Sequence, residues 1–455
     1  MKFKGTISLL LLFLGLGAYV YFGEYKGKDA RQQQADAKKK AITIDSKDIT
    51  EISLVFPDHT ITGVKKGEKQ WEITSPPGID PDQDEWELLA GNVPRIERED
   101  TVTSQATDLA GFGLKDPPLR VIAKTKDGKS VEILFGAENP RKIYNYAKLA
   151  DSNEVFLSPS SWLRIFQKTV NDLRNKKVLD FESDDIDSVT IAAGKDETQF
   201  QKSGTDWVIK KPTESKADGS EISTFISSIK FSRASGFADE KIDLKAAGLD
   251  MPAFKMTLHD AKANTNRELL IGKSPEKDKY YAKDGSRPAI MIIEKEIPEK
   301  AKRPLFDWRD KSITASPIDR DKTDQIEIHR GTETLAVKKD GSDWKSSDGK
   351  KLQADKILGF YNAMEFDRVK EIIDSPKALA TYGLDKPKLE VVFKQGSNEV
   401  KRLSFGSDIK NPEGIYVKSS DAPSVKAVSK DVYDRFNVKM EDLVEAPPPA
   451  TPPKQ

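Results

Sequence analysis

The chain has 455 residues, a length typical of about three domains, and carries 74 basic and 74 acidic side chains. This balance excludes a general electrostatic attraction to nucleic acid or to anionic lipid. The chain contains no cysteine, which excludes disulfides, thiolate catalysis and cysteine-based zinc sites.

The first 23 residues have the pattern of a signal-anchor transmembrane helix. Lys2 and Lys4 precede an apolar run over residues 7–22, and a spanning helix needs about 20 apolar residues, with a lower limit near 17. The alternative is a cleaved signal peptide, whose apolar core is shorter and ends at small residues. Tyr21 and Phe22 favour the uncleaved helix, because aromatic side chains are typical of the membrane interface. We predict an anchor over residues 1–23 and a polar juxtamembrane spacer over residues 24–41.

Basic residues on the two sides of the anchor give opposing signals about its orientation. Lys2 and Lys4 favour a cytoplasmic N-terminus, whereas Lys26, Lys28 and the lysines at 38–40 oppose it under the positive-inside rule. The very short N-terminal tail favours export of the chain beyond the anchor. The sequence therefore predicts a single-pass protein of the inner (cytoplasmic) membrane with most of the chain exported.

Four motifs then recur in the same order, about 135 residues apart. They are a tryptophan (Trp71, Trp207, Trp344), Gly-Leu-x-x-Pro (from Gly113, Gly248, Gly383), a strand-like run ending in glycine (Gly136, Gly272, Gly406) and Tyr-[Ala/Val]-Lys (from Tyr146, Tyr281, Tyr416). A period this long is a whole domain and exceeds the usual solenoid unit. We predict three tandem repeats, over residues 42–181, 182–317 and 318–444, and a disordered proline-rich tail over residues 445–455.

Each repeat is predicted to be an α+β domain, mainly an antiparallel sheet with one or two packed helices. The tryptophan lies in a short strand-like run in the first two copies and is predicted to be a core anchor in all three. An amphipathic helix follows it, as at Ile222, Phe225 and Ile229. Strands follow Gly-Leu-x-x-Pro, with a hairpin signal at residues 127–128.

Gly-Leu-x-x-Pro itself has the pattern of a helix stop, because glycine adopts the left-handed C-terminal conformation and proline cannot continue a helix. A leucine precedes each glycine by four residues (Leu109, Leu244, Leu379). We expect these leucines to pack inward.

The first two copies close with Asp-[Leu/Trp]-Arg-[Asn/Asp]-Lys, at residues 172–176 and 307–311, whereas the third departs from this pattern over residues 437–442. The terminal copy of an array is often atypical because no neighbour follows it. The motif is therefore predicted to contact the next domain.

These repeats resemble an uncharacterised bacterial domain-of-unknown-function family, in which tandem copies with these motifs follow a short membrane anchor. The resemblance covers the anchor and residues 42–444. It implies an association with gliding-motility-type ABC transporter components, as an accessory part. It supplies no catalytic residues.

Residues with potential chemistry are present but do not form a recognisable site. His59, His259 and His329 occupy unrelated places in the three copies, and strand-surface histidines are the simpler interpretation. Gly272-Lys273-Ser274 resembles the end of a phosphate loop, but the glycine needed five residues earlier is Arg267.

Three aspartates resemble the start of a calcium loop (Asp80, Asp82, Asp84). The sixth position, however, is Glu85 where such a loop needs glycine, and acids at a helix start explain the cluster better. The sequence thus assigns no catalytic, cofactor-binding or metal-binding residue and predicts neither a cofactor nor nucleic-acid binding.

Two functions remain open. The first is a membrane-anchored, non-catalytic interaction or scaffold protein of the bacterial envelope, with an envelope protein as its partner and a role as an accessory of an ABC-type transport system. The alternative is a periplasmic enzyme or carbohydrate-binding protein with a cleft between repeats. Convergent acids or histidines in a deep pocket would favour the alternative.

Overall fold

The computed structural model describes residues 13, 15, 16, 19, 21, 39–238, 242–411 and 413–445. Apart from residues 13, 15, 16, 19 and 21, the predicted anchor lies outside the described residues, as do most of the predicted spacer and the proline-rich tail beyond Glu445. Within the described residues, no helix is long and apolar enough to cross a membrane.

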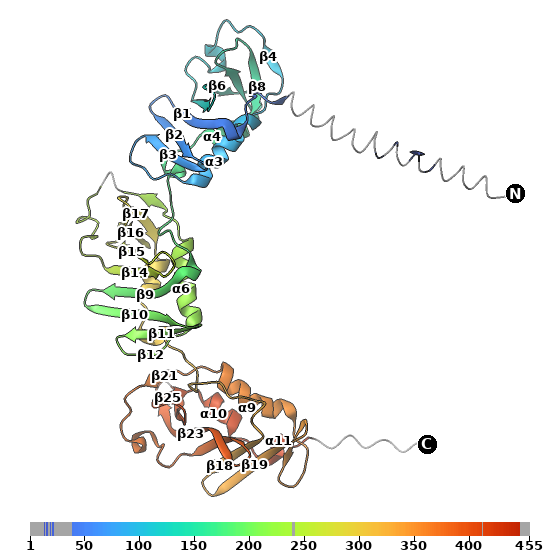
Figure 1. The fold of residues 1–455 in the computed structure, drawn as a ribbon, viewed down its shortest axis with the longest axis vertical. Helices are drawn as coiled ribbons and strands as arrows, with labels where there is room; N and C mark the ends of the chain where they lie inside the picture. Colours follow the sequence, from blue (N-terminus) through green and yellow to red (C-terminus); the bar gives the residue numbers. More distant parts are fainter. Residues whose placement is uncertain are drawn as a thin grey trace, which may run out of the picture. The chain divides into compact units, whose positions relative to one another are not determined.

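The described chain forms three antiparallel sheets, one for each predicted repeat (Figure 1). The first has the order β3-β2-β1-β5-β6-β7-β8-β4, and the third has the matching order β20-β19-β18-β22-β23-β24-β25-β21. The second adds one short strand, β12, at its edge, in the order β12-β11-β10-β9-β14-β15-β16-β17-β13. The predicted antiparallel sheet is therefore confirmed in every repeat.

The strands of the three sheets have the following bounds. In the first they are β1 Ile49–Val55, β2 Thr60–Gly67, β3 Gln70–Ser75, β4 Thr101–Thr103, β5 Leu119–Thr125, β6 Ser130–Glu138, β7 Tyr144–Leu149 and β8 Val155–Pro159. In the second they are β9 Ile186–Ala193, β10 Asp196–Ser203, β11 Asp206–Lys211, β12 Ser215–Lys216, β13 Gly236–Phe237, β14 Phe254–Asp260, β15 Thr265–Ile271, β16 Lys279–Asp284 and β17 Met291–Glu294. In the third they are β18 Gln325–Arg330, β19 Glu333–Asp340, β20 Asp343–Ser346, β21 Glu371–Ile373, β22 Leu389–Gln395, β23 Asn398–Lys410, β24 Glu413–Ser419 and β25 Val425–Val428.

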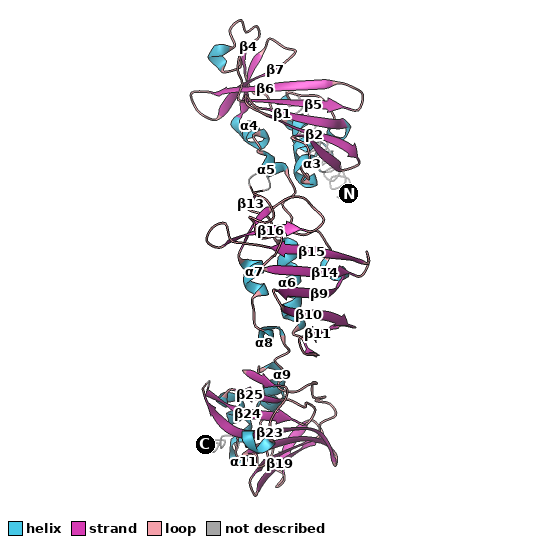
Figure 2. Ribbon diagram, turned by 90° about the vertical axis from the view of Figure 1, so that its left-hand side faces the viewer, coloured by secondary structure: helices cyan, strands magenta, loops and turns pink. Residues whose placement is uncertain are grey.

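In the described chain the α-helices are fewer than the strands (Figure 2). They are α3 Gln83–Asn92, α4 Ser160–Phe166 and α5 Val170–Leu173 in the first repeat, α6 Gly219–Phe231, α7 Glu296–Ala301 and α8 Leu305–Trp308 in the second, and α9 Ala354–Phe366, α10 Lys430–Phe436 and α11 Met440–Leu443 in the third. The chain divides into two compact units, one of Met1–Asp180, Phe231–Met251 and Leu269–Glu294, the other of Phe181–Lys230, Pro252–Glu268 and Lys295–Gln455. The joint between the first two sheets lies inside the first unit, and the joint between the last two lies inside the second.

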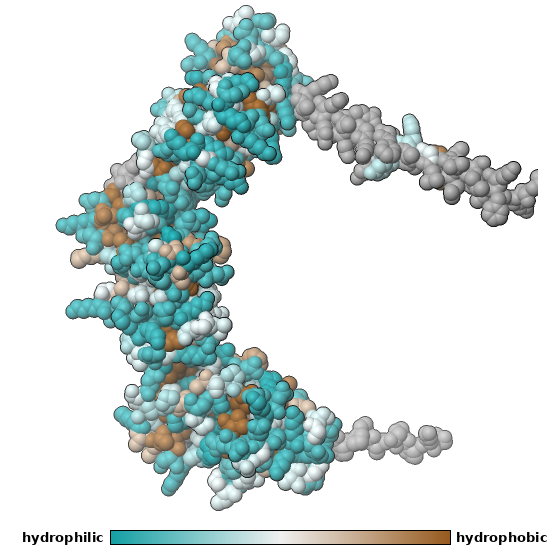
Figure 3. All heavy atoms as spheres, in the orientation of Figure 1, coloured by the Kyte–Doolittle hydropathy of each residue, from teal (hydrophilic) through white to brown (hydrophobic). Residues whose placement is uncertain are grey.

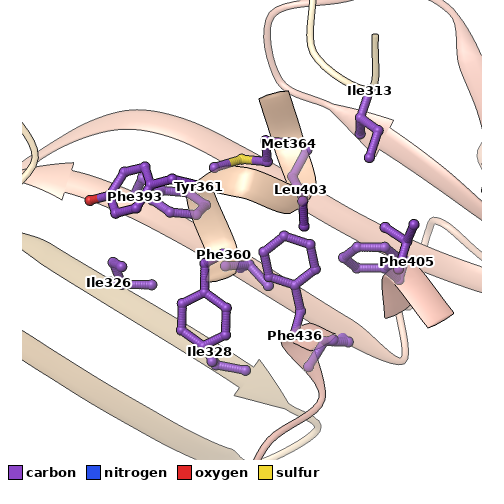
Figure 4. Packing of buried hydrophobic residues seen from close by; sticks show 14 of the residues in the cluster. Ile313, Ile326, Ile328, Phe360, Tyr361, Met364, Phe393, Leu403, Phe405 and Phe436 are labelled. Atoms are coloured by element: carbon purple, nitrogen blue, oxygen red, sulfur yellow. The ribbon is translucent and has the colours of Figure 1, made fainter. Parts of the chain in front are cut away.

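The apolar face of the first long helix in each repeat packs on the sheet, as its spacing predicts. In the third repeat, Phe360 of α9 stacks on Phe436 of α10 with ring centroids 5.5 Å apart, beside Ile328 and Phe405 (Figure 4). In the second, Phe225 of α6 meets Trp308 of α8 edge-on at 5.2 Å. These aromatic contacts join the middle of the second and third repeats to their C-terminal ends.

The repeated tryptophans are core anchors in two copies of the three. Trp71 and Trp207 are 4% and 6% exposed, but Trp344 is only half-buried. In the third copy Lys345 follows this tryptophan, and the strand ends at Ser346. The prediction of three equivalent anchors is therefore wrong for Trp344.

The Gly-Leu-x-x-Pro motif closes a short turn in the way its glycine predicts. Gly113, Gly248 and Gly383 have φ angles of 66°, 69° and 66°. The leucine after each glycine donates its backbone N–H to the carbonyl five residues earlier, as from Leu114 to Leu109 at 2.9 Å. This is the Schellman arrangement of a helix C-terminus.

The leucine that packs inward is the one after the glycine. Leu114, Leu249 and Leu384 are 1%, 3% and 6% exposed, whereas Leu244 and Leu379 are 44% and 39% exposed and Leu109 is half-buried. The inward packing predicted for the earlier leucines is therefore wrong. The left-handed glycine reverses the chain, so the residue after it meets the sheet.

The glycine that ends the strand-like run lets this turn approach the sheet. A Cβ at Gly136, Gly272 or Gly406 would lie 2.3, 2.2 or 2.0 Å from the carbonyl oxygen of Phe112, Ala247 or Tyr382. A backbone carbonyl cannot move aside as the flexible end of a side chain can. These positions therefore require glycine because of the close packing, although their φ angles are not in the left-handed region.

Replacing Gly406 by alanine is expected to destabilise the third repeat by about 1–3 kcal/mol, because the added Cβ overpacks a backbone contact. The matched control is Gly359→Ala in α9, where a Cβ would meet nothing within 4 Å. The control should be neutral or stabilising by about 0.5–1 kcal/mol, the helix preference of alanine over glycine. Urea unfolding of both variants measures the difference, and equal effects would contradict the close-packing explanation.

Replacing Trp207 by alanine should destabilise the second repeat by roughly 3–5 kcal/mol, the usual cost of truncating a buried tryptophan. The same change at half-buried Trp344 should cost clearly less. Limited proteolysis should then cut the Trp207→Ala protein within residues 182–317 first. If Trp207→Ala left the unfolding transition unchanged, the indole would not be a core anchor.

Candidate functional site at the joint between the second and third repeats

Two short segments join the three repeats, and each is paired by backbone hydrogen bonds on both sides. We call residues 174–178 and 309–313 junction segments 1 and 2. In segment 1, Asn175 donates to the carbonyl of Asp80 at 2.7 Å in the repeat before, and Ala234 of the repeat after donates to Lys176 at 2.7 Å. The junction motif therefore contacts the following domain, as its sequence predicts.

Junction segment 2 repeats this pattern in the second unit. The amide of Asp310 donates to the carbonyl of Lys216 at 3.0 Å, and the amide of Val369 donates to the carbonyl of Lys311 at 2.9 Å. Each segment therefore adds a short strand pairing to the repeat that it leaves and to the repeat that it enters.

The segments before the first repeat and after the third repeat each make one of the two pairings seen at a joint. At the N-terminal end, the amide of Ala41 donates to the carbonyl of Ile96 at 2.8 Å, so the last residues of the predicted spacer pair with the first repeat as an incoming segment does. At the other end, Glu445 donates to Lys351 at 3.0 Å, as an outgoing segment does. The equivalent of the junction motif in the third copy is thus at residues 442–445, where Val444 replaces the arginine, and not at 437–442.

The arginine of the junction motif reaches into the next repeat at both joints, with different partners. The guanidinium of Arg174 lies 3.6 Å from the ring centroid of Phe237. Arg309 forms a two-pronged ion pair with Asp374, at 2.8 and 2.6 Å. Planar guanidinium suits both stacking and bidentate recognition of a carboxylate.

A cation of the receiving repeat also holds two consecutive carbonyls of each segment. Lys426 Nζ donates to the carbonyl oxygens of Ser312 and Ile313 at 2.7 and 3.2 Å. At the first joint, Arg287 donates to Lys177 and Val178, the equivalent positions. Burial lowers the pKa of Lys426, because a desolvated ammonium loses its charge more easily.

A half-buried carboxylate, Asp421, fixes the chain directly after junction segment 2. Asp421 accepts the backbone N–H groups of Ala315 and Ser316 at 3.1 and 3.0 Å and pairs with Lys401, whose side chain is 4% exposed. Burial pushes the pKa of Asp421 upward, but the hydrogen bonds from Lys401, Ser419 and Ala315 outweigh it and hold the pKa below its usual value. The carboxylate is therefore charged at neutral pH and satisfied by donors.

Two cavities flank this segment. The larger, of about 350 Å³, lies between the β11–β12 end of the second repeat and the third repeat, with Ser215, Arg309 and Asp374 in its wall. The smaller, of about 100 Å³, is lined by Arg320, Tyr361 and Glu365. Burial raises the pKa of Tyr361 to about 12. Perturbed titrating groups beside a cavity mark a candidate site.

The histidines that the sequence offers are spread over three unrelated surfaces. His59 bonds Asp58 at 2.7 Å, His259 bonds Asp187 at 2.7 Å, and His329 bonds Thr334 at 3.0 Å. The hydrogen bond from Asp187 raises the pKa of His259. Among the described residues, no three histidine, aspartate or glutamate side chains gather as a metal-binding group.

The other two sequence candidates have structural explanations. Asp82 caps α3 by accepting the amides of Asp84 and Glu85 at 3.1 and 3.2 Å. Lys273 donates its backbone N–H to Ala247 at 2.8 Å, which holds the Gly-Leu turn against the strand end.

The lysine of Tyr-[Ala/Val]-Lys has a role that its sequence did not indicate. Lys148, Lys283 and Lys418 donate to carbonyls of the turn after their strand, as Lys418 does to Ala422 and Pro423 at 2.7 and 3.2 Å. The tyrosine packs on the Gly-Leu turn, with Tyr416 edge-on to Tyr382 at 5.0 Å. The lysine therefore fixes the turn after its strand, and the tyrosine packs on the Gly-Leu turn. The recurrence of the motif in all three copies was the only sign in the sequence that these residues have a structural role.

Replacing Lys426 by methionine should destabilise the joint by about 1–3 kcal/mol, because two buried carbonyls lose their donor. The matched control is Lys386→Met at an exposed position, which should change the free energy of unfolding by less than about 0.5 kcal/mol. Urea unfolding and the hydrogen-exchange rate of Val369 measure both effects. Unchanged exchange at Val369 in Lys426→Met would show that the ammonium does not hold the segment.

Comparison with known proteins places these repeats in one family. The model of the domain of unknown function DUF4340 matches the chain three times, over residues 71–252, 207–369 and 351–447. No curated protein and no solved structure matches the chain. The first two matches begin at Trp71 and Trp207 and extend across a joint into the next repeat. The chain therefore belongs to the DUF4340 domain family, which it carries in three tandem copies.

Proposed function

We propose that the chain is a membrane-anchored, non-catalytic scaffold of the bacterial envelope that presents three DUF4340 repeats to a protein partner. The observation that carries the proposal is the two-sided pairing of the junction segments. A simple linker would leave its backbone groups to water. These segments instead use their backbone groups to hold each repeat to the next.

The residues that recur in all three copies support a scaffold, because each has a packing or turn-forming role. The two glycines of each copy form the turn and its close approach to the sheet. The tyrosine packs on that turn, and the lysine holds the turn after its own strand. A catalytic family would be expected to repeat polar groups within reach of one another.

The surface is polar, as expected of domains exposed to water. Figure 3 shows mostly hydrophilic residues on one face of the described chain, with scattered hydrophobic ones. The outgoing end of the third repeat carries ion pairs such as Lys351 with Asp343 at 3.4 Å. Polar terminal copies are typical of tandem arrays. The accessory role in an ABC-type transport system comes from the family resemblance.

A scaffold function predicts that the intact chain purifies with an envelope protein. Cross-linking in native membranes, followed by purification in detergent, should recover one partner reproducibly, with an ABC-type transport subunit expected. Lys426→Met should reduce its recovery if the partner contacts both the second and third repeats, while Lys386→Met should not. A chain that purifies without any stable partner would contradict the proposal.

The proposed export predicts the behaviour of a reporter fused after Lys40. A reporter that is active only in the periplasm should be active there, because the short N-terminal tail and Lys2 and Lys4 favour a cytoplasmic N-terminus. A reporter active only in the cytoplasm is the matched control and should be silent. The reverse pattern would overturn the proposed localisation and leave the repeat architecture unchanged.

A further inference from the structure

An open groove lies in the first repeat between the chain that enters the repeat and the C-terminal end of α3. Its volume is about 500 Å³. The entering chain contributes Lys40, Thr43 and Ser46 to its walls, and the end of α3 with the turn after it contributes Gly91 and Arg95. None of these residues lines either cavity at the second joint.

The same place carries an ion pair in each of the other two repeats. In the second repeat, Lys230 of α6 pairs with Glu182, and in the third, Glu365 of α9 pairs with Arg320, where the cavity measures only about 100 Å³. Pro94 stands at the equivalent position of the first repeat, and no such pair can form there. The groove beside it is therefore left open. The register of the three repeats follows from the equivalent bridges at their incoming segments, Lys40–Glu97, Lys177–Arg233 and Ser312–Arg368.

Two cations line the open groove without a partner. Lys40 and Arg95 are exposed, and neither side chain forms an ion pair or a hydrogen bond within the described residues. One carboxylate, Asp45, lines the groove as well, but it caps the next turn by accepting the backbone N–H of Lys47 at 2.9 Å. The walls therefore carry a net positive charge, which favours an anion over a neutral molecule.

The nearest anions along the chain are those of the membrane in which the anchor is proposed to lie. The predicted anchor ends at residue 23, and Lys40 follows 17 residues later. An extended chain spans at most about 3.3–3.6 Å per residue, so the lipid headgroups lie within about 60 Å of Lys40. Lys26, Lys28 and Arg31 between them favour the same anionic surface. Among anions, the phosphate of a phospholipid is therefore the one that the position of the groove favours.

We propose that this groove binds the phosphate of an anionic phospholipid, with Lys40 and Arg95 pairing with the phosphate oxygens. The contact holds the first repeat at the membrane surface. It is a local site and needs no net charge on the chain as a whole. The inference rests on the proposed membrane anchoring, but the groove can be tested without the anchor.

The first test titrates the full chain, in a nonionic detergent, with dihexanoyl phosphatidylglycerol. Calorimetry should show saturable binding, about tenfold tighter than that of dihexanoyl phosphatidylcholine, because the ammonium group of the latter offsets its phosphate. Lys40→Gln and Arg95→Gln should each weaken binding about fivefold, the effect of one basic side chain near an anionic lipid surface. The matched control is Lys115→Gln/Arg141→Gln, which removes one lysine and one arginine from exposed positions outside the groove and should bind as the parent chain does.

A second readout exploits the absence of cysteine in the chain. Thr43→Cys places a single thiol in the groove wall of the full chain reconstituted into vesicles that contain phosphatidylglycerol. A neutral reagent should alkylate this thiol more slowly than the same thiol in the Lys40→Gln/Arg95→Gln background. A thiol at Ser130→Cys, exposed on the same repeat, should react at the same rate in both backgrounds.

The proposal is overturned if phosphatidylglycerol does not bind at millimolar concentration, or if Lys40→Gln/Arg95→Gln weakens binding no more than the control variant does. Inorganic phosphate that binds as tightly as the lipid would make the groove a site for free phosphate. Hexaglutamate that binds more tightly would make it a docking site for an acidic protein segment, and either result overturns the lipid assignment. A chain that the vesicles do not retain would contradict the proposed anchor, while the titration in detergent would still decide whether the groove binds the lipid.

Discussion

The backbone pairing of each junction segment with two repeats at once is the constraint on which the tandem arrangement depends. In segment 1, Asn175 donates to Asp80 of the repeat before, and Lys176 accepts from Ala234 of the repeat after. Asp310 and Val369 make the same pairing at segment 2. Each segment is hydrogen-bonded to both repeats. Separating the segment from one repeat would therefore leave backbone N–H and C=O groups without their hydrogen-bond partners. The arginine of the junction motif and a cation from the receiving repeat, Arg287 or Lys426, add side-chain contacts to the same few residues.

Within each repeat, the recurrent residues work through backbone geometry more than through side-chain chemistry. Gly383, in the left-handed conformation, reverses the chain, and Leu384 after it is buried. Gly406 lets the carbonyl of Tyr382 in this turn approach the sheet more closely than a residue with a Cβ would allow. Lys418 ties the next turn to the same region. The arginine of the junction motif, by contrast, meets different partners at the two joints, Phe237 for Arg174 and Asp374 for Arg309.

The sheet content, the repeat period and the turn at Gly-Leu-x-x-Pro could be predicted from sequence, because each depends on local spacing or on a conformation that only glycine adopts readily. The burial of Trp344 could not, because its exposure depends on how strand β20 packs and not on the period. The inward leucine was misplaced by five residues, since a Schellman turn buries the residue after the reversal. A cleft between repeats was part of the alternative function that the sequence left open, but the residues of the junction cavity could not be predicted, because Ser215, Arg309 and Asp374 meet only through long-range pairing.

Hydrogen exchange of the native chain, followed by mass spectrometry at the two joints, tests the two-sided pairing most directly. The amides of Asn175, Ala234, Asp310 and Val369 should exchange far more slowly than those of an unstructured linker, since all four donate to backbone carbonyls. Asn175 and Asp310 donate to the repeat that their segment leaves, and Ala234 and Val369 donate to the segment from the repeat that it enters. Ala234 and Val369 are the decisive pair, because they lie in the receiving repeats. Exchange of these two amides at the rate of an unfolded peptide, with the sheet interiors still protected, would contradict a joined array and leave three domains on simple linkers.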